Sequence, residues 1–171
     1  MVMGGYYLRY KGQQLPEDET KFVIMDIVKR YGYEHIITLG SSKGGSAALF
    51  HGISIGADEV ICGACQYYVG TYLISQNNIE CLKQMVKNPS DAKEIEILDS
   101  LIPQAIHSAY AKPRITLIYS KLEHTYPEHI QYLLRDLKSN GYNIVEEERD
   151  FQNHMEIGVY FAKYLNQRFI K

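Results

Sequence analysis

Three polar residues that lie far apart in the sequence are of the types that nucleophilic catalysis uses. Ser42 is the centre of GSSKG, Glu123 lies in SKLEH, and His154 lies in FQNHM. A serine hydroxyl becomes a nucleophile when a histidine takes its proton, and a carboxylate then holds that histidine in the required tautomer. The three residues therefore raise the hypothesis of acyl-group chemistry, provided that the fold brings them together.

The G-x-S-x-G pattern around Ser42 predicts a nucleophile elbow, a sharp turn between a strand and a helix. Gly40 and Gly44, two positions before and after the serine, are small enough to let strand and helix approach. The backbone N–H of Lys43, at the helix start, is then an oxyanion donor, helped by the helix dipole. A phosphate-binding loop is excluded by residue order, and G-x-G-x-x-G is absent. A Schiff-base role for Lys43, or a glycine-serine turn that only packs helix on strand, stays open.

Apolar residues alternate between strand-like and helix-like spacing along the chain. Predicted strands cover residues 35–39, 59–65, 115–119 and 143–149, and predicted helices cover residues 21–31, 46–55, 90–110, 126–140 and 156–169. The crossovers are long enough for parallel pairing, so we expect a three-layer αβα domain with a mostly parallel sheet. The first predicted strand is mostly apolar, which is typical of a strand buried on both faces.

The remaining segments are harder to place in this single domain of residues 1–171. Residues 1–20 show no clear pattern of secondary structure, although residues 6–10 are strand-like. Residues 66–110 form a cap-like insertion between strands, in which 66–88 are irregular or partly helical and Pro103 interrupts an apolar stripe.

Ser42, Glu123 and His154 each follow a predicted strand, and ligands of such sheets bind beyond the carboxyl ends of the strands. Their order along the chain, serine then acid then histidine, is the order that accompanies a nucleophile elbow. We expect Ser42 Oγ on one ring nitrogen of His154 and Glu123 on the other, each at about 2.6–3.2 Å. The predicted substrate-binding residues follow the second strand: Gln66, Tyr67 and Tyr68. For these tyrosines, a half-buried surface role is the alternative.

The sequence resembles the α/β-hydrolase superfamily, through the elbow, EHTY after a later strand and NHxE near the end. Over roughly residues 20–165 it is similar to bacterial hydrolase-like proteins of surface-polysaccharide biosynthesis and glycoprotein export, including a component of the accessory secretion system. The resemblance implies a serine esterase or acyltransferase that acts, without a cofactor, on a small-molecule or glycan-linked acyl substrate. The alternative is a non-catalytic hydrolase-like binding domain of the same pathways.

The start of the chain differs from the α/β-hydrolase pattern. Only about 35 residues precede the elbow strand, whereas several strands precede it in a full α/β-hydrolase. The loop that usually supplies a second oxyanion N–H follows an early strand, and this sequence shows no evident source for that donor. A missing N-terminal segment and a homo-oligomer both stay open.

The composition of the chain limits the kinds of partner that it is expected to bind. The chain has 171 residues and a net charge of −2, and its basic residues are scattered, so we expect no nucleic-acid partner. It contains neither a signal-peptide pattern nor an apolar run of about 20 residues, so we expect a cytoplasmic protein without a membrane span. Cys62 and Cys65 have C-x-x-C spacing, but no second ligand pair follows. We expect structural, reduced cysteines and no metal.

Overall fold

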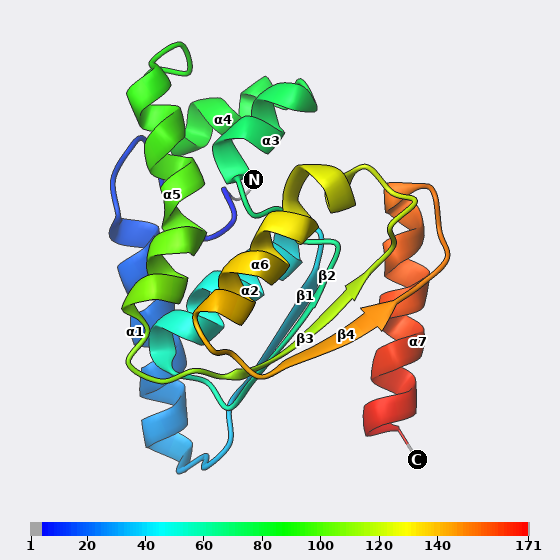
Figure 1. Cartoon of the computed structure of the whole chain (residues 1–171). Helices are drawn as coiled ribbons and strands as arrows, with labels where there is room; N and C mark the ends of the chain where they lie inside the picture. The colour runs from blue at the N-terminus through cyan, green and yellow to red at the C-terminus, as the bar shows by residue number, and fades with distance from the viewer. Residues whose placement is uncertain (1–4, 171) are drawn as a thin grey trace.

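A computed structural model of the chain describes residues 5–170. Within them, four strands form one sheet in the order β1-β2-β3-β4, and every neighbouring pair is parallel. The strands are β1 Ile37–Ser41, β2 Glu59–Gly63, β3 Arg114–Tyr119 and β4 Ile144–Glu148. Because consecutive strands are neighbours and run the same way, the loops that leave them all emerge at one edge of the sheet (Figure 1).

Helices cover both faces of this sheet. They are α1 Leu15–Tyr31, α2 Lys43–Ile55, α3 Val69–Ser75, α4 Ile79–Met85, α5 Ala92–Ser108, η1 Tyr126–Ile130 (a π-helix), α6 Gln131–Ser139, η2 His154–Glu156 (a 3₁₀ turn) and α7 Ile157–Phe169. In Figure 1, α7 lies on one side of the strands and α2, α5 and α6 lie on the other. The predicted αβα layering with a parallel sheet is confirmed.

The core follows from the two-residue repeat of a strand, which sends successive side chains to opposite faces. On β2, Val60 and Cys62 join the larger core under α2, α5 and α6, whereas Ile61 joins a smaller core under α7. Each of these three side chains is fully buried. Burial of each aliphatic side chain contributes about 1.5–3 kcal/mol, so both helical layers stabilise the sheet that carries the site.

The first strand differs from the prediction. It lies at the edge of the described sheet, and Ile37 and Leu39 are 40% and 47% exposed. Thr38 faces the opposite way, and its hydroxyl donates to the carbonyl of Ala48 on α2 at 2.8 Å. Since α2 covers only this second face of β1, the apolar residues of the first face are only partly covered. The expectation of burial on both faces was wrong.

Some helix boundaries also differ. Helix α1 begins at Leu15 rather than near residue 21, because Pro16 stands in the first turn, where a missing N–H costs little. The strand-like residues 6–10 form turns, with one isolated bridge between Tyr10 and Gln13. Residues 66–88 contain two short helices, and α5 continues through Pro103. No helix within residues 5–170 has both the length and the apolar character that crossing a bilayer requires.

Candidate active site

Ser42 occupies the turn between β1 and α2 in a strained backbone conformation. Its φ is 51° and its ψ is −124°, a region that L-residues rarely adopt. The backbone N–H of Ser42 donates to the carbonyl of Gly63 at the end of β2, at 2.7 Å. This hydrogen bond fixes the turn to the neighbouring strand. The turn is the predicted elbow, and its side chain projects beyond the carboxyl end of the sheet.

Two glycines allow strand and helix to approach closely at the elbow. Gly40 is one of them, as predicted, but the other is Gly45 and not Gly44. A Cβ on Gly40 would lie 2.3 Å from the carbonyl oxygen of Gly44, so residue 40 must be glycine. A Cβ on Gly44 would meet nothing within 4 Å. The second close approach is at Gly45, whose added Cβ would lie 3.1 Å from Cys65 and from the carbonyl of Gly63. Because α2 begins at Lys43, residue 45 rather than 44 faces the sheet.

The three predicted polar residues lie in one line of hydrogen bonds. Ser42 Oγ is 2.7 Å from His154 Nε2, and His154 Nδ1 is 2.8 Å from Glu123 Oε1. A carboxylate only accepts, so Nδ1 carries the proton and Nε2 is the acceptor for the serine hydroxyl. Both distances fall in the expected range, although the three residues come from segments that follow β1, β3 and β4.

A residue that the sequence did not single out ties two of these segments together. The hydroxyl of Ser120, buried at the end of β3, accepts the backbone N–H of Leu122 at 3.1 Å and that of Phe151 at 3.3 Å. One loop carries Glu123 and the other carries His154. The hydroxyl therefore sets the spacing between acid and histidine. Serine directly after an apolar strand was the available signal.

The loop of His154 is fixed locally by a capping box. Asn153 accepts the backbone N–H of Met155 at 3.0 Å, and Glu156 accepts that of Asn153 at 2.9 Å. Two backbone donors at the start of this helical turn are thus satisfied by side chains. The imidazole is consequently held on a short, ordered segment.

Glu123 is 1% exposed, yet its surroundings favour the charged form. Burial raises the pKa of the carboxyl, but hydrogen bonds from His154 and from the Thr125 hydroxyl, with the attraction of nearby imidazoles, outweigh burial and lower it overall. One of those imidazoles is His124, whose Nδ1 lies 2.9 Å from Glu123 Oε1. A carboxylate that stays ionised can keep His154 in the tautomer that accepts a proton from Ser42.

An aromatic wall borders the histidine. The ring of Tyr72, on α3, is stacked on His124 at 6.3 Å and 11°, and its centroid is 6.4 Å from that of His154. Its edge also meets the buried His129 at 5.5 Å. Burial lowers the pKa of His129 to about 4, so this imidazole is neutral at neutral pH. The Tyr72 ring, packed against the neutral His129, therefore borders one side of His154.

Comparison with known proteins gives a likeness of structure rather than of sequence. No family profile matches the chain, and no curated sequence is similar to it. Among solved structures, the capsule O-acetyltransferase of Neisseria meningitidis serogroup A superposes with a TM-score of 0.78 at 18% identity, over 96% of this chain and 67% of that one. The fold is that of the α/β-hydrolases.

Two further α/β-hydrolase-like structures also superpose on this chain. The Gap123 glycosylation-associated protein complex of Streptococcus agalactiae has a TM-score of 0.71 at 19% identity, over 97% of this chain and 35% of that one. Pyrococcus horikoshii acylaminoacyl peptidase has a TM-score of 0.67 at 15% identity, over 96% and 27%. The chain thus spans about a third of the Gap123 chain and about two thirds of the O-acetyltransferase. At these identities the likeness shows the fold alone.

Of the other predicted site residues, two lie beside Ser42 and one is directed away from it. Lys43 is the first residue of α2, so its backbone N–H stands beside Ser42, and the side chain of Gln66 reaches Ser42 Oγ at 3.3 Å. Tyr68 is half-buried and packs against Tyr132. The hydroxyl of the buried Tyr67 donates instead to Asp136 on α6 at 2.5 Å, so it is directed into the structure.

Side chains of metal-ligating types lie close together at two places. Ligand atoms of Glu123, His124 and His154 lie within 4.8 Å of one another. His154 Nδ1 is hydrogen-bonded to Glu123 at 2.8 Å, so a metal bound here would have to displace the Nδ1 proton of His154. Cys62 and Cys65 are buried and free, and the contact with Cys65 together with burial raises the pKa of Cys62. That these thiols hold no zinc stays a prediction.

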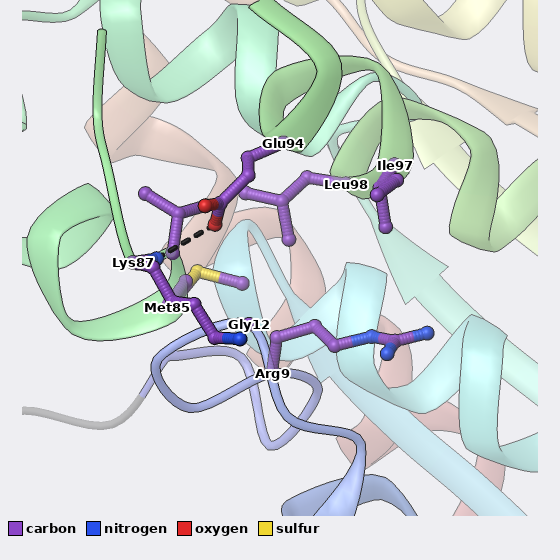
Figure 2. A pocket seen from close by; sticks show the side chains of 8 residues that line it. Arg9, Gly12, Met85, Lys87, Glu94, Ile97 and Leu98 are labelled. Carbon is purple, nitrogen blue, oxygen red and sulfur yellow. Dashed lines mark hydrogen bonds between the residues drawn. The ribbon is translucent and has the colours of Figure 1, made fainter. Parts of the chain in front are cut away.

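A separate cavity of about 200 Å³ lies between the N-terminal turns, the end of α4 and α5 (Figure 2). Its residues are Arg9, Gly12, Met85, Val86, Lys87, Glu94, Ile97 and Leu98. The carboxylate of Glu94 is occupied by the backbone N–H groups of Lys87 at 2.6 Å and Asn88 at 3.3 Å. Arg9 lies 2.6 Å from Glu17. The charged groups of Glu94 and Arg9 are therefore already engaged within the protein.

Proposed function

We propose that this chain is a serine esterase or acyltransferase that acts on an acylated substrate, with Ser42 as nucleophile. The observation that carries the proposal is the continuous line from Ser42 Oγ through His154 to Glu123, at 2.7 and 2.8 Å, on a strained elbow. Strain of this kind costs about 1–3 kcal/mol and persists where the surrounding structure enforces it. A turn that only packed a helix on a strand would not need it.

In the acylation step, Ser42 Oγ attacks the ester carbonyl carbon while His154 Nε2 takes the hydroxyl proton. The ionised Glu123 stabilises the imidazolium that forms. The tetrahedral intermediate then collapses: the bond to the ester alcohol breaks, and His154 returns the proton to the leaving alcohol. The acyl group is left on Ser42. The backbone N–H of Lys43, beside the positive end of α2, donates to the oxyanion.

In the second step, an acceptor hydroxyl attacks the acyl-enzyme and His154 takes its proton. Water as acceptor gives hydrolysis, and a sugar hydroxyl gives transfer. His154 then returns the proton to Ser42 as the serine leaves. The same residues serve both outcomes, so the acceptor that fits beside His154 decides between them.

Two observations support a sugar-linked acyl substrate. The likenesses include a capsule O-acetyltransferase and a glycosylation-associated protein complex. Tyr72 borders His154, and the half-buried Tyr68 follows the same strand as Gln66. Such rings combine an apolar face with a hydroxyl, which suits a sugar ring.

The three free cysteines suit a reducing compartment, and a cytoplasmic location is part of the proposal.

The second candidate is a hydrolase-like domain that binds a glycan or a protein partner without catalysis. The Gap123 likeness is to a protein named as part of a complex, which favours this candidate. To separate the two, nitrophenyl acetate turnover and release of acetate from an O-acetylated oligosaccharide are measured for the wild type, Ser42→Ala and His154→Ala. Activity in the wild type that both variants lose supports the enzyme. A silent wild type that still binds the oligosaccharide supports the binding domain.

A further inference from the structure

The reactive oxygen has a second hydrogen-bond partner besides the histidine. Nε2 of Gln66 lies 3.3 Å from Ser42 Oγ. Gln66 is fully buried, in the segment between β2 and α3, and β2 is the strand next to the elbow strand. A fully buried amide that reaches a nucleophile from the neighbouring strand is a preorganised donor.

The neighbours of this amide determine which of its ends faces Ser42. Nε2 also lies 3.3 Å from the carbonyl oxygen of Ala64, which can only accept. At the other end of the amide, the hydroxyl of Tyr6 donates to Oε1 at 3.3 Å, and Ser46 Oγ lies 3.2 Å from it. The NH₂ group therefore points toward Ser42 and the carbonyl points away.

The segment that carries the amide is anchored to the elbow helix. The backbone N–H of Gln66 donates to Ser46 Oγ at 2.8 Å, and that hydroxyl lies 2.9 Å from the Gln66 carbonyl oxygen. Ser46 is fully buried on α2, the helix that Ser42 precedes. The amide and the nucleophile are consequently held by the same helix, and little reorganisation is needed when charge develops.

We propose that the Gln66 side chain is the second oxyanion donor, acting beside the backbone N–H of Lys43; this inference rests on the proposed acyl chemistry. When Ser42 Oγ bonds to the carbonyl carbon, the oxyanion sits on that same carbon. We infer that the amide N–H, now 3.3 Å from Oγ, turns from Oγ to the oxyanion and there reaches the 2.7–3.1 Å of an oxyanion donor. The sequence shows no evident second donor, and this side chain supplies one.

The test compares two substrates in one protein sample. Gln66→Met keeps the length of the side chain and removes the donor, and Gln66→Asn withdraws the amide. An ester and the matching thionoester are turned over by each variant, because sulfur accepts hydrogen bonds poorly. We expect kcat for the ester to fall about 10²–10³-fold in Gln66→Met while KM changes little. The thionoester rate should fall much less, so that the preference for the ester collapses.

The ratio of the two rates does not depend on how much of a variant is folded, so partial misfolding does not mimic the result. Tyr67→Phe is the matched control: it removes a hydroxyl that bonds to Asp136, beside Gln66 in the sequence, and leaves the amide and its partners in place, so the preference for the ester should stay within a few-fold of the wild type. Equal losses for both substrates in Gln66→Met and Gln66→Asn would show that Gln66 only positions Ser42, and unchanged rates would remove it from the mechanism. A wild type that turns over neither substrate, and whose Ser42 resists acylating reagents, would instead defeat the proposed function.

Discussion

His124 Nδ1 lies 2.9 Å from Glu123 Oε1, the same carboxylate oxygen that His154 Nδ1 approaches at 2.8 Å. Two imidazoles thus approach one carboxylate oxygen, and only His154 is hydrogen-bonded to it and in line with Ser42. The attraction of His124 is one of the influences that hold the pKa of Glu123 below its ordinary value. His124 is therefore a positioning residue for the acid in the proposed reaction.

His124→Phe keeps a ring against Tyr72 and removes the nitrogen beside Glu123. Since one partly exposed charge contact is worth up to about 1 kcal/mol, we expect kcat for the ester to fall at most about fivefold. Glu123→Gln should cost more, because it removes the acceptor of the His154 proton. In the Glu123→Gln background, His124→Phe should have no further effect. Additive losses in this double-mutant cycle would show that His124 acts independently of the acid.

The elbow glycines give a matched pair for stability. Gly40→Ala places a Cβ 2.3 Å from a backbone oxygen and should lower the free energy of unfolding by about 3 kcal/mol. Gly44→Ala meets nothing within 4 Å and lies in the first turn of α2, so it should be neutral or stabilising by up to about 1 kcal/mol. Urea unfolding of both variants measures the difference. Similar values would mean that β1 and α2 are not this close.

The strain at Ser42 can be measured without catalysis. Its φ of 51° suits glycine better than alanine, and neither replacement has a hydroxyl. We expect Ser42→Gly to be more stable than Ser42→Ala by about 1 kcal/mol, after allowance for the greater freedom of glycine in the unfolded chain. If Ser42→Ala proves equally stable or more stable in urea unfolding, the turn is relaxed.

The sequence predicted those features that depend on local residue patterns and missed those that depend on contacts between distant segments. The strands, their parallel order and the three polar residues at their carboxyl ends follow from apolar runs and chain order, which are local patterns. Ser120 acts through a contact between two loops, and such a contact has no periodicity to reveal it. Tyr67 was predicted to bind substrate because it follows the second strand, but its hydroxyl bonds to Asp136 on α6. Proximity in sequence does not fix where a side chain points.

The errors at element ends have physical reasons as well. Helix α1 begins before the predicted start at residue 21, because a first helical turn tolerates Pro16. β1 looked like an interior strand because Ile37 and Leu39 are apolar, and only the sheet order shows that it is an edge. Composition reports what a residue prefers, whereas exposure depends on which neighbours the fold provides.

Buried histidines predict the pH dependence of stability. Burial lowers the pKa of His51 and of His129 from 6.5 to about 4. Between these values the unfolded chain binds protons that the folded chain does not, so the free energy of unfolding should fall as the pH drops from about 6.5 to 4. Each histidine can contribute up to about 3 kcal/mol to that loss.

Urea unfolding as a function of pH checks this loss. The double variant His51→Gln/His129→Gln should show a shallower fall over the same range, although its stability at neutral pH is lower. His35→Gln, at a side chain that is 82% exposed, is the control and should leave the slope unchanged. A slope in the double variant that equals that of the wild type would contradict the assignment.

The central claim is that Ser42 is a nucleophile activated by His154. Its most direct measurement is covalent labelling by a fluorophosphonate, read by mass spectrometry of the intact protein and its peptides. We predict one label per chain, on Ser42, with labelling abolished in Ser42→Ala and strongly slowed in His154→Ala. An unlabelled wild type, or a label that persists in Ser42→Ala, would contradict the account.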